Sequence, residues 1–310
     1  MKKPLRLSAS LSNDMKLNLS DMAFIKESFQ TTWGGVKTHG TWYLPDGPAG
    51  LAVLVHGFGE HSGRYEDSVI PLLTSEKWAV LAFDLVGHGR SGGKRGDCAG
   101  YSQLLEQVTT AWGMGRSRFP NLPGLLYGHS MGGNLVLNVV LRGLAEPDAL
   151  VASSPYLRLA FRPPAWKWQA GKLLLHLLPS VTLPSGLDPQ GISRDKREVE
   201  AYRNDPLVHD RVSPRYSFPI LEAGEWALEH AGELGVPAFV AHGTADPIID
   251  PDGSRLFCER APRCRMYWEE GAFHELHHET SRRRFLDALG AWLRERQEGQ
   301  VLPRADQAKM

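Results

Sequence analysis

The sequence predicts an α/β protein with a mostly parallel central sheet flanked by helices. Two observations predict this fold class: short continuous apolar runs recur along the chain, and stretches with helical periodicity lie between most of them. Strands that are buried on both faces read as continuous apolar runs, whereas half-exposed strands alternate. The 310 residues are enough for one large domain of this kind.

The expected strands and helices follow one another in a regular order. Two stretches with interleaved apolar and polar positions flank Gly34-Gly35 between residues 23 and 44, which indicates an antiparallel hairpin. Buried strands are then expected at 50–55, 78–83, 124–127, 150–153, 237–241 and 265–268, and helices at 65–75, 103–118, 131–143, 252–260 and 280–297. Such alternation indicates a sheet with helices on both faces.

One long segment interrupts the alternation. Residues 156–226 contain many prolines, the bulky run Trp166-Lys167-Trp168 and a leucine-rich stretch. We therefore expect 156–226 to form an inserted helical cap, or lid, on a core made of 22–155 and 227–297. The polar ends of the chain are expected to be poorly ordered at 1–21 and frayed at 298–310.

Composition excludes several classes of function. Lys plus Arg (35) balances Asp plus Glu (35), so no overall field favours nucleic acid, and we expect no nucleic-acid partner. No stretch approaches the ~18 apolar residues of a transmembrane helix or the ~7–15 of a signal peptide, which favours a cytoplasmic protein. Cys98, Cys258 and Cys264 have no zinc-ligand spacing, so we expect no metal site and three buried thiols; one disulfide stays the open alternative.

A nucleophile motif lies between an expected strand and an expected helix. Gly128-His129-Ser130-Met131-Gly132 matches the G-x-S-x-G nucleophile elbow of the α/β-hydrolase fold, in which a serine projects from a sharp turn at the sheet edge. Small residues must flank this strained turn to avoid clashes with the neighbouring chain. The position of the motif therefore favours Ser130 as a nucleophile. The alternative is a glycine-rich turn without chemistry.

A serine nucleophile needs a histidine base, and the histidine needs an acid that orients it. In this fold the acid precedes the histidine in the chain, and each follows a strand. Asp246 follows the strand expected at 237–241, and His274 follows the last expected strand, so we predict the triad Ser130, Asp246 and His274. Four residues compete for these roles. Asp250 and Asp252 lie near the next helix start and are expected to act as N-caps, and His277 and His278 lie at or just before the last helix and are expected to be solvent-facing or helix-terminal.

An oxyanion hole needs two backbone amides aimed at the reacting carbonyl oxygen. In this fold one amide follows the nucleophile, and the other comes from the loop after the first buried strand. We therefore predict Met131 and, within His56-Gly57-Phe58-Gly59, Phe58 as the donors. The alternative for the glycine-rich run is an ordinary turn.

Several longer runs carry a more specific signal. They are His56-Gly57-Phe58-Gly59-Glu60-His61-Ser62-Gly63-Arg64-Tyr65, Asp84-Leu85-Val86-Gly87-His88-Gly89-Arg90-Ser91, 128–133, His242-Gly243-Thr244-Ala245-Asp246 and Phe273-His274-Glu275. With these runs the sequence resembles the monoacylglycerol lipase family and its lysophospholipase-like relatives over about residues 22 to 295. It departs from several relatives at Phe58, where they have a small residue, and in the cap between 157 and 171.

The resemblance implies hydrolysis of a monoacylglycerol, or a similar small lipid ester, to fatty acid and alcohol without a cofactor. It also implies that cap residues of 156–226 shape the acyl tunnel and that the triad and the oxyanion donors are the five residues named above. A general carboxylesterase or a lysophospholipase would use the same triad. A non-catalytic binding protein of this fold should lack a triad residue, and a peptidase would need an acidic site for the substrate's amino group.

Apolar residues of the expected cap allow two roles. They are Trp166, Trp168, Leu173, Leu174, Leu177 and Leu178, with Lys167 and Lys172 nearby. Such a face would suit peripheral contact with a lipid surface. The same residues could instead pack onto the core and line the pocket. The sequence leaves both roles open, and they do not exclude each other.

Overall fold

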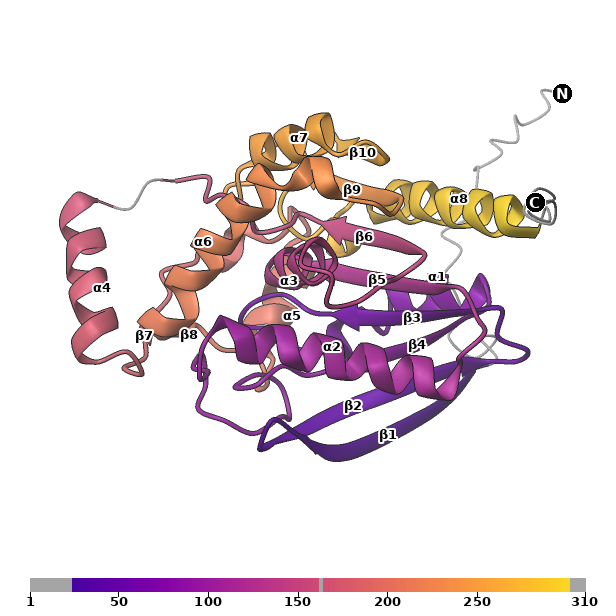
Figure 1. The fold of residues 1–310 in the computed structure, drawn as a ribbon. Helices are drawn as coiled ribbons and strands as arrows, with labels where there is room; N and C mark the ends of the chain where they lie inside the picture. The colour runs from indigo at the N-terminus through magenta and orange to yellow at the C-terminus, as the bar shows by residue number, and fades with distance from the viewer. Residues whose placement is uncertain (1–23, 162–163, 302–310) are drawn as a thin grey trace, which may run out of the picture.

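The computed structural model describes residues 24–161 and 164–301, and in them an eight-stranded sheet lies between two layers of helices (Figure 1). The strand order is β1-β2-β4-β3-β5-β6-β9-β10. β1 (Phe24–Trp33) and β2 (Val36–Pro45) form the antiparallel hairpin, and the parallel strands are β3 (Gly50–Val55), β4 (Trp78–Phe83), β5 (Gly124–His129), β6 (Ala149–Ser153), β9 (Ala238–Gly243) and β10 (Cys264–Glu269). The predicted hairpin and parallel sheet are confirmed; residues 1–21 lie outside the described ranges.

Apolar side chains pack on both faces of the sheet. In β3, Val53 and Val55 join one apolar cluster while Ala52 and Leu54 join the other, and all four are fully buried. This two-sided burial explains why the strand reads as a continuous apolar run. One face is covered by α2 (Tyr101–Arg118), α3 (Met131–Leu141), α6 (Pro214–Glu229) and α7 (Pro251–Arg260), and the other by α1 (Val69–Ser75) and α8 (Arg282–Val301).

The helix expected at 65–75 begins later than predicted, at Val69. A 3-10 helix, η2 (Ser62–Tyr65), comes first. Its start is held to the loop after β4, because both the amide and the hydroxyl of Ser62 donate to Asp84 Oδ1, at 2.9 and 2.7 Å. A backbone held in this way cannot enter the regular helix until the following turn.

Two of the three cysteines differ from the expectation of buried thiols. Cys258 and Cys264 are joined by a disulfide, with Cα atoms 5.1 Å apart, and both are half-buried. α7 ends at Arg260 and β10 begins at Cys264, so the short connection brings the two sulfurs together. Cys98 is a free, buried thiol as expected.

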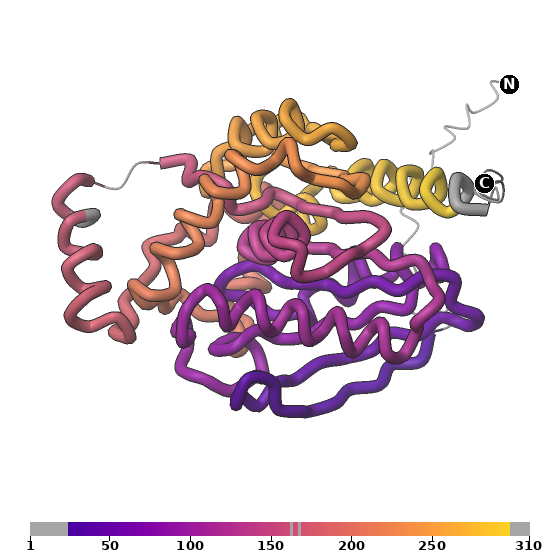
Figure 2. Tube along the Cα trace, viewed as in Figure 1, coloured from indigo at the N-terminus to yellow at the C-terminus, as the bar shows by residue number. Residues whose placement is uncertain are grey.

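The segment 156–226 leaves the sheet after β6 and returns before β9, as the trace in Figure 2 shows. It contains α4 (Ala165–Leu177), β7 (Leu183–Pro184), η3 (Pro189–Gly191), α5 (Lys196–Asn204), β8 (Arg211–Val212) and most of α6. η4 (Ala231–Glu233) then leads back to the sheet, and η5 (Leu276–His278) precedes α8. Across 24–161 and 164–301, none of the helices has both the length and the apolar character of a membrane span.

The turn between β5 and α3 passes very close to the first buried strand. A Cβ at Gly132 would lie 2.1 Å from the carbonyl oxygen of Val55. Overpacking against a fixed backbone costs about 1–3 kcal/mol or more, so Gly132→Ala should lower the midpoint of urea unfolding. The matched control is Gly113→Ala in α2, which is exposed and has nothing within 4 Å of the new Cβ; it should gain about 0.5–1 kcal/mol. Equal stability of the two variants would contradict the close approach.

Candidate active site

Ser130 occupies a strained turn at the end of β5. Its backbone has φ 51° and ψ −115°, a conformation that L-residues adopt rarely and at an energetic cost. Gly128 is required beside it, because a Cβ there would lie 2.2 Å from the carbonyl oxygen of Gly132. The turn is held from both sides: the Ser130 amide donates to Ser153 O at 2.8 Å, and the Ser130 carbonyl accepts from the Tyr156 amide at 2.9 Å.

Asp246 lies in the loop after β9, and all the accepting positions of its carboxylate are engaged. Oδ1 accepts the backbone amides of Ile248 and Ile249 at 2.8 and 3.1 Å. Oδ2 accepts His274 Nδ1 at 2.6 Å and His242 Nε2 at 3.0 Å. Burial alone would raise the pKa of Asp246, but the two histidines outweigh it and hold the pKa below its usual range.

The competing carboxylates take other roles. Asp250 caps α7, because its side chain accepts the Asp252 amide. Asp252 is exposed and pairs with Arg255 at 3.0 Å. The expected helix-capping role is therefore seen for Asp250, and the structure brings Asp246 to His274 instead.

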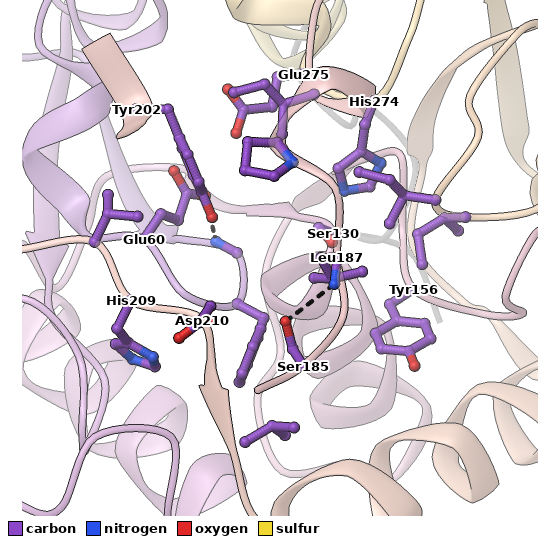
Figure 3. A pocket seen from close by; sticks show the side chains of 18 of the residues that line it. Glu60, Ser130, Tyr156, Ser185, Leu187, Tyr202, His209, Asp210, His274 and Glu275 are labelled. Atoms are coloured by element: carbon purple, nitrogen blue, oxygen red, sulfur yellow. Dashed lines mark hydrogen bonds between the residues drawn. The ribbon is translucent and has the colours of Figure 1, made fainter. Parts of the chain in front are cut away.

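His274 and Ser130 line one cavity of about 400 Å³ (Figure 3). His274 lies in the loop after β10, and its ring is buried. Burial lowers the pKa of His274, but the Asp246 carboxylate and its hydrogen bond outweigh this effect, so the pKa is raised. The side chains of Ser130, His274 and Asp246 thus come from loops that follow β5, β10 and β9.

His277 and His278 take the helix-terminal position that was expected, just before the last helix, but the solvent-facing alternative is wrong. Both lie in η5 and are buried. The His277 ring stacks on Tyr65, with ring centroids 4.7 Å apart. His278 binds Glu275 Oε2 at 2.8 Å and the Arg64 carbonyl at 2.9 Å. Neither lines the cavity that holds Ser130.

A buried arginine joins the loop after β3 to the loop that carries His274. Arg64 donates to Glu60 at 2.9 Å and forms a two-pronged pair with Glu275, both bonds at 2.7 Å. Glu60 in turn accepts the Gly57 amide and the Tyr65 hydroxyl, each at 2.7 Å. Sequence reasoning quoted these residues only as part of a family run. Their pairing joins residues 211 positions apart, which no local pattern reveals.

Glu275, His277 and His278 also form a group whose donor atoms lie within 4.8 Å of one another. The Arg64 guanidinium already binds Glu275 with two hydrogen bonds and approaches His278 Nδ1 at 3.0 Å. A fixed positive charge therefore stands where a cation would be bound.

Of the two predicted oxyanion donors, Phe58 lines the cavity and Met131 directly follows Ser130, which also lines it. Met131 opens α3, and amides in the first turn of a helix have no partner within the helix. Phe58 lines the cavity, in the turn that Glu60 holds through Gly57. The Phe58 ring meets the rings of His209 and Tyr216 edge-on, at 5.7 and 5.6 Å, so it joins the core to the cap segment.

The rest of the cavity wall is largely apolar and comes mostly from the segment 156–226. Its apolar members are Tyr156, Leu187, Ile192, Val208, Val212, Tyr216 and Ile220, joined by Ile248 and Ile249 of the core. The leucines of α4 are not among them. Leu173 and Leu177 are exposed, so for these residues the expected pocket-lining role is wrong; the side chain of Trp168 lies outside the described part of the structure.

Comparison with known proteins gives a consistent assignment. A family described as serine aminopeptidase S33 matches residues 46–281. A monoacylglycerol lipase from Mycolicibacterium smegmatis is 33% identical over 264 residues, 84% of this chain and 94% of that protein. The crystal structure of a monoacylglycerol lipase from Paleococcus ferrophilus, 32% identical, matches with a TM-score of 0.74 over 89% of this chain and 100% of that one.

The chain belongs to the monoacylglycerol lipase family. It is therefore a carboxylic ester hydrolase of the α/β-hydrolase fold, as the sequence predicts. It also spans 27% of the length of an abhydrolase domain-containing protein from Dictyostelium discoideum, with 32% identity over 261 residues.

Removing the Arg64 charge should destabilise this family member strongly. Arg64→Met would leave the buried Glu60 without its counter-charge and Glu275 with His278 alone, and breaking a buried ion pair costs about 3–5 kcal/mol. Urea unfolding followed by circular dichroism measures the loss. Arg197→Met is the control, because that guanidinium is 91% exposed beside Asp195 and its loss should leave the unfolding midpoint unchanged. Similar midpoints for both variants would contradict the role assigned to Arg64.

Proposed function

We propose that the protein hydrolyses monoacylglycerols to a fatty acid and glycerol through Ser130, His274 and Asp246. One observation carries the proposal: the strained turn that presents Ser130 opens into the same cavity as His274, whose ring is bound to Asp246. Nucleophile, base and orienting acid need this arrangement.

In the first half of the reaction, the Ser130 oxygen attacks the ester carbonyl carbon while His274 Nε2 takes the hydroxyl proton. Asp246 accepts Nδ1–H, keeps Nε2 free to act as a base and stabilises the imidazolium. The amides of Phe58 and Met131 donate to the oxygen that becomes negative. The imidazolium then protonates the departing glycerol oxygen, which leaves an acyl-enzyme on Ser130.

In the second half, water attacks the acyl carbon as His274 takes one of its protons. The tetrahedral intermediate expels the Ser130 oxygen, which recovers a proton from His274. The fatty acid is released, and the enzyme returns to its starting state. His274 must begin each half reaction neutral, so activity should fall at acidic pH.

The composition of the cavity wall is evidence for a substrate with a lipid acyl group. Most of its apolar lining residues come from the cap segment, and such a wall suits a hydrocarbon chain. The charged residues of the lining have both signs: Arg203 is basic, and Glu60, Asp188, Asp210 and Glu275 are acidic. No cluster of cations is seen in the described lining, and such a cluster would be needed to favour the phosphate of a lysophospholipid.

An aminopeptidase activity is less well supported. A peptidase of this kind needs a carboxylate free to bind the substrate's amino group. Glu60 and Glu275 line the cavity, but Arg64 neutralises both with hydrogen bonds of 2.7 to 2.9 Å. Their accepting positions are thus already occupied by the protein.

Replacing Ser130 with Ala tests the function directly. Ser130→Ala should reduce kcat on a 1-monoacylglycerol and on a short-chain ester by about 10⁴-fold or more, because no nucleophile remains. Ser117→Ala, an exposed serine in α2, is the control and should retain full activity. If Ser130→Ala still hydrolyses either ester, Ser130 is not the nucleophile. If the wild-type protein hydrolyses lysophosphatidylcholine faster than monoacylglycerol, the proposed substrate class is wrong.

We also propose that α4 rests on a lipid surface while the substrate enters. Trp166, Leu173, Leu177 and Leu178 are 68%, 59%, 66% and 56% exposed. Leu173 and Leu177 lie one turn apart, so they share a face of the helix. α4 packs against α6 and lies at the outer side of the cap, away from the sheet (Figure 1). A lipid substrate resides in a membrane surface, and an exposed apolar helix face can bind to that surface.

Removing apolar area from α4 should weaken membrane binding without stopping the chemistry. The double change Leu173→Ser and Leu177→Ser should lower the partition coefficient on phosphatidylcholine vesicles, measured by sedimentation, by about 10-fold or more. Turnover of a water-soluble short-chain ester should persist. Leu144→Ser is the control, because Leu144 is 47% exposed but lies outside α4, just after α3. Unchanged vesicle affinity of the double variant would contradict the proposal.

A further inference from the structure

A second histidine lies beside the carboxylate that orients His274. His242, in β9, is fully buried. Its Nε2 lies 3.0 Å from Asp246 Oδ2, and its Nδ1 lies 2.7 Å from Ser254 Oγ on α7. His242 does not line the substrate cavity, so it reaches the reaction only through Asp246.

The partners of Asp246 leave one consistent arrangement of protons. An ionised carboxylate has about four accepting positions and no proton to donate. Two of them take the amides of Ile248 and Ile249, and a third takes His274 Nδ1–H. His242 Nε2 must therefore carry a hydrogen and donate it to the fourth.

Asp246 fixes the tautomer of His242, and Ser254 supplies the partner that this tautomer needs at Nδ1. A neutral imidazole that carries its hydrogen on Nε2 has Nδ1 free to accept, and the Ser254 hydroxyl is the donor that faces it. Ser254 is fully buried, so water does not compete for this bond. The bonds then run from Ser254 through His242 and Asp246 to His274.

We propose that His242 is a positioning residue that holds the Asp246 carboxylate in the orientation in which Oδ2 meets His274. Without it, Oδ2 would be held only by His274 itself. The carboxylate could then pivot about Oδ1, which the Ile248 and Ile249 amides hold, and misdirect the base. This inference rests on the proposed function, because it gives Asp246 and His274 their roles. The other titratable groups that face His274 are His129, with ring centroids 4.9 Å apart, and the carboxylates of Glu60 and Glu275.

Three variants separate positioning from mere packing. His242→Phe keeps a ring of similar size but removes both nitrogens. His242→Gln restores an N–H donor near the position of Nε2, and Ser254→Ala removes the hydroxyl partner of His242 Nδ1. We expect His242→Phe to lower kcat on a soluble ester about 10- to 100-fold with KM unchanged, as when a partner that orients a functional histidine is lost. His242→Gln should recover most of the loss, and Ser254→Ala should fall between them.

The pH profile gives a readout that loosened packing would not produce. Removing the Nε2–H donor leaves the Asp246 charge less satisfied and more strongly coupled to His274, which raises the pKa of His274 further. The acidic limb of the kcat/KM profile should therefore move to higher pH in His242→Phe and return toward the wild-type position in His242→Gln. An equal loss of kcat in the Phe and Gln variants, or an acidic limb that does not rise in His242→Phe, overturns the inference.

Labelling of Ser130 by a fluorophosphonate probe keeps this test independent of the substrate. The labelling rate reports activation of the serine, and circular dichroism checks that each variant is folded. If the wild-type protein hydrolyses no ester, the proposed function fails. The inference about His242 is then tested by the labelling rates alone. It predicts that the wild-type protein is labelled fastest, His242→Gln more slowly and His242→Phe most slowly, and equal rates would overturn it.

Discussion

The close approach of the turn at Ser130 to the first buried strand is the constraint on which the site depends. Gly132 lies so near the Val55 and His56 carbonyls that no side chain fits. This contact fixes the start of α3 against the end of β3, and therefore fixes the Met131 amide relative to the loop that carries Phe58. The positive φ of Ser130 is the local cost of the arrangement. A serine on a relaxed turn would point its oxygen elsewhere.

Sheet topology explains why residues distant in the chain meet at this turn. β3 and β5 are neighbours, and the chain leaves β3 toward β4 on one side before it returns to β5 on the other. Loops at the carboxyl ends of such strands diverge and leave a crevice where ligands bind. The loops after β9 and β10 open at the same edge, which brings Asp246 and His274 to Ser130. Ser130, Asp246 and His274 therefore occur in the chain in the same order as the strands β5, β9 and β10 that they follow.

Sequence patterns predict what depends on local periodicity and strand order. The continuous run 50–55 predicts a strand that is buried on both faces, and strand ends predict where Ser130, Asp246 and His274 lie. They do not predict the partners of buried charges, because the pair between Arg64 and Glu275 depends on how two distant loops pack. For the same reason the apolar pattern of α4 could not show which face is covered, since burial depends on the neighbouring α6.

Polar contacts divide the cap segment into a part that is fixed to the core and a part that is not. Asp97, in a loop of the core, accepts Ser213 Oγ at 2.7 Å and binds Arg215 with two bonds of 2.8 Å, and His61 meets Asp205 at 2.8 Å. These contacts hold α5 and α6, which together with β8 supply cavity residues. The described side chains of α4 are absent from the cavity wall, and α4 packs against α6. The exposed apolar residues of α4 and the residues that line the cavity therefore belong to different parts of the segment 156–226.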